Sequence, residues 1–256
     1  MQELLLNGAV LHLSRTNAPE GRPTLVFLHD SLGSTELWRD FPAALAEATN
    51  CGSLVYDRQG YGKSSPFTSR SRPVTYLEQE ADVLEQVLAA CHITEAVLFG
   101  HSDGGSIVLL AAAKYPARVQ GVVTEGAHIF VEDVTLAGIR TAVEAYQTTN
   151  LPSRLQKYHG DKTDALFQAW TETWLRDEYR TWNIEAFLRR ITCPVLVIQG
   201  EQDEYGTLAQ VEGIVQQVAG EAHQLLLPGI GHTPHREARE AVLAQTAAFL
   251  NQVLVP

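Results

Sequence analysis

The chain has 256 residues, of which 45% are hydrophobic, and it carries a formal net charge of −11 at pH 7. This length suits one large α/β domain or two small ones, and the acidic charge argues against binding to nucleic acid or to an anionic membrane. No run of about eighteen apolar residues that could cross a bilayer occurs, and the N-terminus lacks the basic start and cleavage site of a secretory signal.

The first part of the chain predicts strands that alternate with helices. Asn7-Gly8 is a turn signal within an alternating stretch, so a hairpin is expected over 3–16. The continuous apolar run 24–30 is typical of a strand buried on both faces. The next expected elements are a helix with a Ser or Thr cap over 34–49, a strand ending in a Gly-rich turn over 53–62, and a helix over 75–91.

The second part continues this alternation, with one interruption. Strands are expected over 96–102, 119–127, 193–200 and 223–229, and helices over 102–116, between the last two strands, and over 235–253. Strands that alternate with helices indicate an α/β fold with an eight-stranded, mostly parallel sheet and helices on both faces. Residues 1–127 and 192–256 would form this core. The interval 128–191 has amphipathic helical stretches and no convincing strand, so we interpret it as a helical cap inserted after the sixth strand.

A serine stands between two glycines in the stretch Gly100-His101-Ser102-Asp103-Gly104. Gly-x-Ser-x-Gly between a buried strand and a helix is the nucleophile elbow, in which a strained serine presents its hydroxyl beside the helix N-terminus. Such a serine needs a base and an orienting acid. Asp203 and His232 follow the next two strands at the same sheet edge, so Ser102, Asp203 and His232 are the predicted triad. Glu125, which ends the sixth strand, is the alternative acid.

The loop after the first long strand, His29-Asp30-Ser31-Leu32-Gly33, is expected to complete an oxyanion hole. Its donors would be the backbone N–H groups of Ser31 and Asp103. We expect His29 to be a structural residue beneath this loop. His235 is expected to be an N-terminal residue of the last helix rather than a catalytic base.

The motifs HDSLGS, YDRQGYGKS, GHSDGG, GEQD and GIGH resemble the α/β-hydrolase superfamily across nearly the whole chain. Within it, SDGGSIVLLAAAKYP followed by EGAHIFVED looks like the valacyclovirase-type hydrolases, which cleave α-amino-acid esters. In that group the aspartate after the nucleophile holds the substrate's ammonium, and the resemblance assigns this role to Asp103. It also implies a helical cap between the sixth and seventh strands. This sequence departs from the superfamily at Asp30, where glycine is usual, and at the polar end of the sixth strand, 125–128.

The charge of Asp103 raises a specific question, because it would oppose the oxyanion by roughly 1 kcal/mol or more at an effective dielectric near 20. Its side chain either turns away to stabilise the helix N-terminus or faces a cationic substrate group. Asp30, Glu125 and Glu204 fall around the same sheet edge and favour a negative pocket that attracts an amine. One or two cap aromatics among Phe130, Trp170, Trp174 and Trp182 would line this pocket. The predicted substrate-binding residues are Asp30, Asp103, Glu125, His128, Trp170, Trp174 and Tyr205.

The sequence therefore predicts a serine hydrolase that cleaves a small carboxylic ester, or an amine-bearing ester or amide, through an acyl-enzyme. One alternative is a carbon–carbon bond hydrolase of a dioxo acid, whose anionic substrate would need a cap arginine such as Arg140, Arg154 or Arg176. The other is a ligand-binding receptor with a vestigial triad.

Neither a cofactor nor a metal is implied, because QGYG lacks the dinucleotide fingerprint and no His/Asp cluster has ligand spacing. The expected partner is a small-molecule substrate, with no nucleic acid and no membrane, and a homodimer is left open. Three scattered cysteines, Cys51, Cys91 and Cys193, indicate reduced thiols and a cytoplasmic location.

Overall fold

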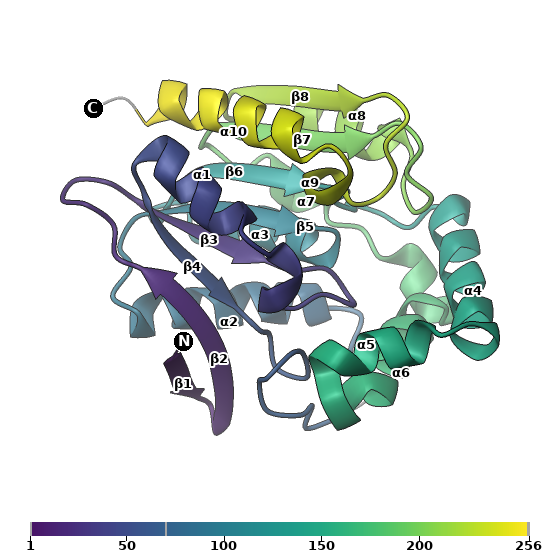
Figure 1. The fold of residues 1–256 in the computed structure, drawn as a ribbon. Coiled ribbons are helices and arrows are strands. Elements are labelled where there is room, and N and C mark those ends of the chain that lie inside the picture. The colour runs from purple at the N-terminus through teal and green to yellow at the C-terminus, as the bar shows by residue number, and fades with distance from the viewer. Residues whose placement is uncertain (1, 70, 255–256) are drawn as a thin grey trace.

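The computed structural model describes residues 2–69 and 71–254, which form one eight-stranded sheet with helices on both faces (Figure 1). The strand order is β1-β2-β4-β3-β5-β6-β7-β8. The hairpin β1–β2 pairs antiparallel with the sheet, and the remaining strands are parallel to one another. The predicted fold class is confirmed. The strands are β1 (Gln2–Leu6), β2 (Ala9–Thr16), β3 (Thr24–Leu28), β4 (Gly52–Tyr56), β5 (Ala96–His101), β6 (Val119–Glu125), β7 (Val195–Gly200) and β8 (Ala222–Leu227).

Helices connect the parallel strands and fill the interval between β6 and β7. None of the helices in the described part of the chain is long and apolar enough to cross a membrane. The α-helices are α1 (Phe41–Thr49), α2 (Tyr76–Ala90), α3 (Asp103–Lys114), α4 (Asp133–Thr148), α5 (Leu151–His159), α6 (Thr163–Trp174), α7 (Glu185–Leu188), α8 (Leu208–Gln217), α9 (Pro234–Glu237) and α10 (Arg239–Val253), and the 3-10 helices are η1 (Thr35–Trp38), η2 (Gly160–Lys162) and η3 (Asp177–Thr181).

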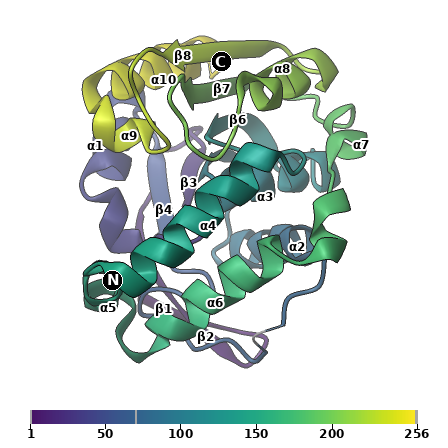
Figure 2. The same ribbon diagram turned by 90° about the vertical axis from the view of Figure 1, so that its right-hand side faces the viewer.

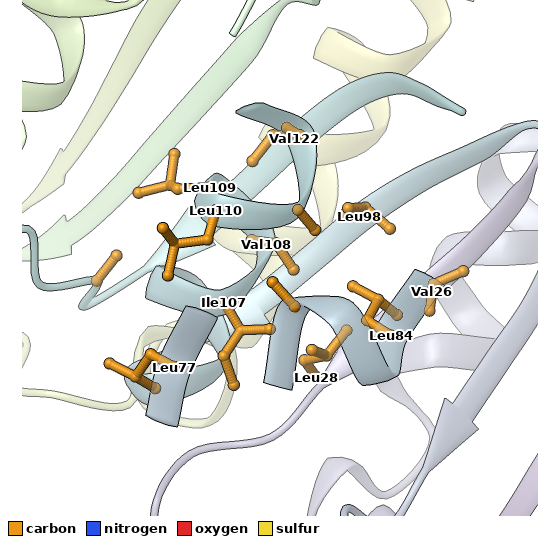
Figure 3. Packing of buried hydrophobic residues seen from close by; sticks show 14 of the residues in the cluster. Val26, Leu28, Leu77, Leu84, Leu98, Ile107, Val108, Leu109, Leu110 and Val122 are labelled. Carbon is orange, nitrogen blue, oxygen red and sulfur yellow. The ribbon is translucent and has the colours of Figure 1, made fainter. Parts of the chain in front are cut away.

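The central strands are mostly apolar and buried because helices cover both faces of the sheet. Alternate residues of a strand point to opposite faces, so Phe27 and Phe99 pack with α1 and α10. Their neighbours Val26 and Leu98 point the other way and pack against α2 and α3 (Figure 3). Two apolar layers therefore hold the strands from both sides and fix where their carboxyl ends lie.

The carboxyl ends of the parallel strands lie together at one edge of the sheet, on the right in Figure 1. In Figure 2, which faces this edge, α4 and α6 lie in front of the sheet. These helices belong to the 128–191 segment, which leaves β6 and returns to β7. A single β-bridge between Phe130 and Asn183 joins the start of this segment to its later part.

Two helices differ from their predicted extent. The helix expected over 34–49 is divided into η1 and α1, since Arg39 takes a φ of +53° and Pro42 stands in the first turn of α1. The helix expected over 235–253 is divided into α9 and α10 at Ala238, which has non-helical φ and ψ of −130° and 43°. His235 therefore lies in the short helix α9 and not at the start of the last helix.

Candidate active site

Ser102 occupies the corner between β5 and α3 with a φ of +55°, a left-handed conformation that non-glycine residues rarely adopt. The flanking glycines are required by close backbone approach. A Cβ atom at Gly100 would lie 2.1 Å from the carbonyl oxygen of Gly104, and one at Gly104 would lie 2.2 Å from that of Leu28. This corner places Ser102 on the wall of a cavity, beside the N-terminus of α3.

His232 and Asp203 are joined across the loops that follow β8 and β7. The Nδ1 atom of His232 lies 2.8 Å from Oδ2 and 2.9 Å from Oδ1 of Asp203. The same carboxylate accepts hydrogen bonds from the Gln199 side-chain amide and from the Tyr205 backbone N–H, each at 2.8 Å. Because an ionised carboxylate only accepts, Nδ1 of His232 carries the proton, and Nε2 is the basic nitrogen of the neutral ring.

The charges around His232 favour its protonated form. Burial alone would lower the pKa of His232, but the Asp203 carboxylate and its hydrogen bond raise it above the usual value, with smaller contributions from Glu204 and Asp30. For Asp203, burial acts to raise the pKa, and the proximity of His232 lowers it overall. Asp203 therefore stays ionised while His232 is able to take up a proton.

Two buried histidines hold the loops that carry this pair. His101 Nε2 donates to the backbone carbonyl of His232 at 2.7 Å, and burial lowers the pKa of His101 to about 4. His128 Nε2 donates to the carbonyl of Tyr205 at 3.0 Å, and burial likewise lowers its pKa. Both rings are therefore neutral near pH 7 and act as fixed hydrogen-bond donors.

The loop after β3 is held from below by His29, as the sequence predicted. His29 Nδ1 donates to the Asp30 carbonyl at 2.8 Å, and its Nε2 accepts from the Arg58 backbone N–H at 3.1 Å. The Arg58 guanidinium donates to the carbonyls of His29 and Asp30 at 3.3 and 3.0 Å. These bonds fix the backbone that leads into Ser31, which lies on the cavity wall beside Ser102.

The cavity has a volume of about 60 Å³ and gathers most of the predicted site residues. Three lining residues, Leu32, Thr135 and Ile139, were not predicted. Thr135 and Ile139 lie four residues apart on the buried face of α4, a spacing that the sequence does contain. The lining residues are Asp30, Ser31, Leu32, Ser102, Asp103, His128, Thr135, Ile139, Trp170, Trp174, Tyr205 and His232.

Glu125 is placed differently from the prediction. Its side chain is fully buried, and its Oε2 accepts a hydrogen bond from His235 Nδ1 at 2.6 Å, away from the cavity wall. His235 in turn packs its ring on Trp38, with 4.5 Å between centroids. The expectation that Glu125 faces the substrate is thereby corrected, because its carboxylate is directed toward α9. Of the remaining candidates, Phe130, Trp182, Arg140, Arg154 and Arg176 are not among the residues that line this cavity.

The Asp103 carboxylate is buried and already has partners within the protein. Its Oδ2 accepts from the Tyr76 hydroxyl at 2.8 Å and lies 4.0 Å from Nη2 of the buried Arg58. The Tyr76 hydroxyl also accepts from Trp174 Nε1 at 3.0 Å. The Asp103 side chain therefore does not turn to solvent, and its charge has partners within the protein. Tyr76 and Arg58 are site residues that the sequence analysis did not predict.

Comparison with known proteins identifies the family of the chain. The model of the alpha/beta hydrolase family matches residues 25–245. The chain belongs to this family. Human "Serine hydrolase BPHL" is 30% identical over 239 residues, which are 89% of this chain and 78% of the human protein. The solved enol-lactonase of Burkholderia xenovorans LB400 has a TM-score of 0.77 at 19% identity and covers 97% of this chain and 99% of its own. The 2-hydroxy-6-oxo-6-phenylhexa-2,4-dienoate hydrolase (BPHD) of Rhodococcus sp. strain RHA1 has a TM-score of 0.81 at 17% identity, with 96% of both chains covered.

As a member of the alpha/beta hydrolase family, the chain is a hydrolase. The strained Ser102 and His232, with its basic Nε2 atom, line the cavity of this alpha/beta hydrolase, and the buried, ionised Asp203 contacts the other ring nitrogen of His232. Such a set can activate a hydroxyl group as a nucleophile. Among residues 2–69 and 71–254, no group of three or more His, Cys, Asp or Glu side chains is placed to hold a metal ion.

Proposed function

We propose that the protein hydrolyses small carboxylic esters through an acyl-enzyme formed on Ser102. The Oγ atom of Ser102 attacks the ester carbonyl while His232 Nε2 takes its proton, and Asp203 orients and stabilises the imidazolium. The backbone N–H groups of Ser31 and Asp103 hold the oxyanion. The observation that carries this proposal is the His232–Asp203 hydrogen bond at the wall of the cavity that also exposes Ser102.

The second half of the reaction reverses the proton transfers. His232 gives its proton to the leaving alcohol as the ester C–O bond breaks, and it then takes a proton from the water that attacks the acyl-enzyme. As the tetrahedral intermediate collapses, the bond to Ser102 Oγ breaks and His232 returns the proton to that oxygen, which releases the carboxylic acid. No cofactor takes part in this scheme, because each proton and each bond is accounted for by the ester, water and the three side chains.

The dimensions of the cavity favour a short acyl group. Its volume of about 60 Å³ is far below the roughly 300–1,000 Å³ of a pocket for a drug-sized ligand. Ile139, Trp170 and Trp174 supply apolar walls. The acyl chain that these side chains accept therefore contains only a few carbon atoms.

The negative charge of the cavity favours a second, narrower substrate class, esters whose acyl group carries an amine. Asp30 and Asp103 line the cavity, and no lysine or arginine of the described chain does. An ammonium group would share the Asp103 carboxylate with Tyr76 and Arg58. The same charge disfavours the anionic dioxo acid of the carbon–carbon alternative, for which the Rhodococcus enzyme supports the fold alone.

The test compares L-alanine ethyl ester, N-acetyl-L-alanine ethyl ester and 4-nitrophenyl acetate as substrates. We expect wild-type turnover of 4-nitrophenyl acetate with a burst of nitrophenol, and a loss of at least about 10³-fold in Ser102→Ala. A preference for the free amine that is lost in Asp103→Asn would establish the narrower candidate. If Ser102 reacts with an organophosphonate but no ester turns over, the carbon–carbon reaction replaces this proposal.

A further inference from the structure

A second cavity, of about 220 Å³, adjoins the catalytic cavity. The two cavities share Asp30 and Leu32 in their walls, so the oxyanion loop forms the boundary between them. The second cavity is bounded by η1, α5 and α9, which come from three separate parts of the chain. Its further lining residues are Leu37, Leu151, Arg154, Leu155, Lys157, Tyr158 and Arg236.

The α5 wall of this second cavity is attached to the catalytic loops. His159, the last residue of α5, contacts the Leu32 carbonyl through Nε2 at 3.0 Å and accepts the Gly62 N–H at Nδ1 at 2.9 Å. Arg154 lies three residues before Lys157 and four before Tyr158, so these side chains share one face of α5. The position of the cationic side chains is thus set by the same bonds that support the oxyanion loop.

The second cavity carries charge of the opposite sign to the catalytic one. Arg154, Lys157 and Arg236 line it together with one acid, Asp30. All three side chains are exposed, and their charged groups form no ion pair or hydrogen bond within residues 2–69 and 71–254. Some other exposed cations of the described chain do form ion pairs, as Arg239 does with Asp40 and Lys63 with Glu36. Three unpaired cations around one concavity, in a chain of net charge −11, attract an anion.

We propose that this second cavity is a subsite for a carboxylate carried by the leaving-group part of the substrate. The inference rests on the proposed ester hydrolysis and adds its substrate class, an ester between a short acyl group and an alcohol that bears an anionic group. The catalytic cavity is too small to hold such an ester whole, so part of the substrate extends past Leu32.

The position of Arg236 indicates which part of the substrate extends into the second cavity. Arg236 follows His232 by four residues, and His232 protonates the leaving alcohol, so that alcohol departs on this side of the catalytic cavity. Arginine binds carboxylates through two parallel hydrogen bonds. An acidic catalytic cavity beside a basic second cavity also sets the direction in which an ester with charged ends binds.

The experiment compares 4-acetoxybenzoate with 4-acetoxybenzamide, which has nearly the same shape but no charge on the leaving phenol. We expect wild type to prefer the benzoate by about tenfold in kcat/KM through a lower KM, and salt to weaken this preference. The triple variant Arg154→Gln/Lys157→Gln/Arg236→Gln should lose the preference and keep its activity on the benzamide. Arg140→Gln, an exposed cation of α4 that lines neither cavity, is the matched control and should keep the preference.

A binding measurement separates this subsite from the ester chemistry. If wild type turned over neither compound, the proposed function would fail, and 4-hydroxybenzoate would then be tested as a competitor of organophosphonate labelling at Ser102. Slower labelling in wild type but not in the triple variant would support the subsite on its own. Equal turnover of both esters, or equal behaviour of the triple variant and the Arg140→Gln control, would overturn the inference.

Discussion

The Tyr76 hydroxyl donates a hydrogen bond to Asp103 Oδ2 at 2.8 Å, and this bond joins the first turn of α2 to the residue that follows Ser102. The Arg58 guanidinium approaches the same oxygen to 4.0 Å. A carboxylate next to the nucleophile is therefore partly compensated by the protein before any substrate binds. This compensation lessens the repulsion that Asp103 would exert on the oxyanion in a cavity of low dielectric.

Tyr76→Phe is expected to weaken both stability and catalysis. The variant leaves a buried carboxylate oxygen without its hydrogen-bond donor, which costs about 1–3 kcal/mol of unfolding free energy. The less compensated charge of Asp103 should also lower kcat/KM for 4-nitrophenyl acetate by about tenfold. Denaturant unfolding and steady-state kinetics measure the two effects. Tyr146→Phe removes a similar bond, to Asp164 at the surface, and should change neither.

The pH dependence of kcat/KM should follow the titration of His232. His232 acts as a base only when neutral, and its pKa lies above the usual 6.5, so the rate should fall as the pH drops through a midpoint above 6.5. Asp203→Asn removes the charge that raises the pKa, so the midpoint should move to lower pH and the rate should fall by about 10³–10⁴-fold. A pH–rate profile from about pH 5 to pH 9 measures both. A wild-type midpoint at or below 6.5 would contradict the raised pKa of His232, and an unchanged midpoint in Asp203→Asn would contradict Asp203 as its cause.

Glu125→Gln should separate the buried Glu125–His235 pair from catalysis. Glutamine can still accept the His235 N–H, so we expect kcat/KM to stay within about threefold of wild type, with an unchanged pH midpoint. Glu125→Ala removes the acceptor and should lower the unfolding free energy by about 1–3 kcal/mol, measured in denaturant. A shifted midpoint in Glu125→Gln would instead assign Glu125 a role as triad acid.

The glycines of the elbow should not tolerate even a methyl group. In Gly104→Ala the new Cβ would lie 2.2 Å from the Leu28 carbonyl oxygen, so the elbow or β3 must shift. We expect a loss of about 1–3 kcal/mol in stability and a larger relative loss of kcat/KM. Gly121→Ala is the matched control, because its Cβ would meet its nearest neighbour at an ordinary 3.8 Å. Equal melting temperatures for the two variants would show that the elbow is not so tightly packed.

The sheet could be predicted from the sequence because each of its signals is local. The apolar runs before Ser102, Asp203 and His232 identify strands, and parallel strands bring the residues that follow them to one edge. The breaks at Arg39 and Ala238 were not predicted, although Pro42 is a local signal that a helix starts after Arg39. Ala238 is an ordinary residue in a helical composition, and only its final φ and ψ show that the helix stops there.

The surroundings of Asp103 could not be predicted for a different reason. Tyr76 opens an amphipathic helix and has the same pattern as an aromatic core residue, and Arg58 is one charge in a Gly-rich turn. Their meeting with Asp103 depends on how α2 and the turn after β4 pack against α3 in three dimensions. Glu125 shows the opposite error, since a residue at the correct sheet edge can still direct its side chain away from the cavity.

The His159 ring joins two loops that are far apart in the sequence, and this has a mechanical consequence. A single imidazole contacts Leu32, next to the proposed oxyanion donor Ser31, and Gly62, in the turn that follows Arg58. Any displacement of α5 must break these bonds or move the backbone of the loop that carries Ser31. The position of α5 is thus coupled to the loop beside Ser102. A substrate that contacts α5 would therefore also hold this loop in place through His159.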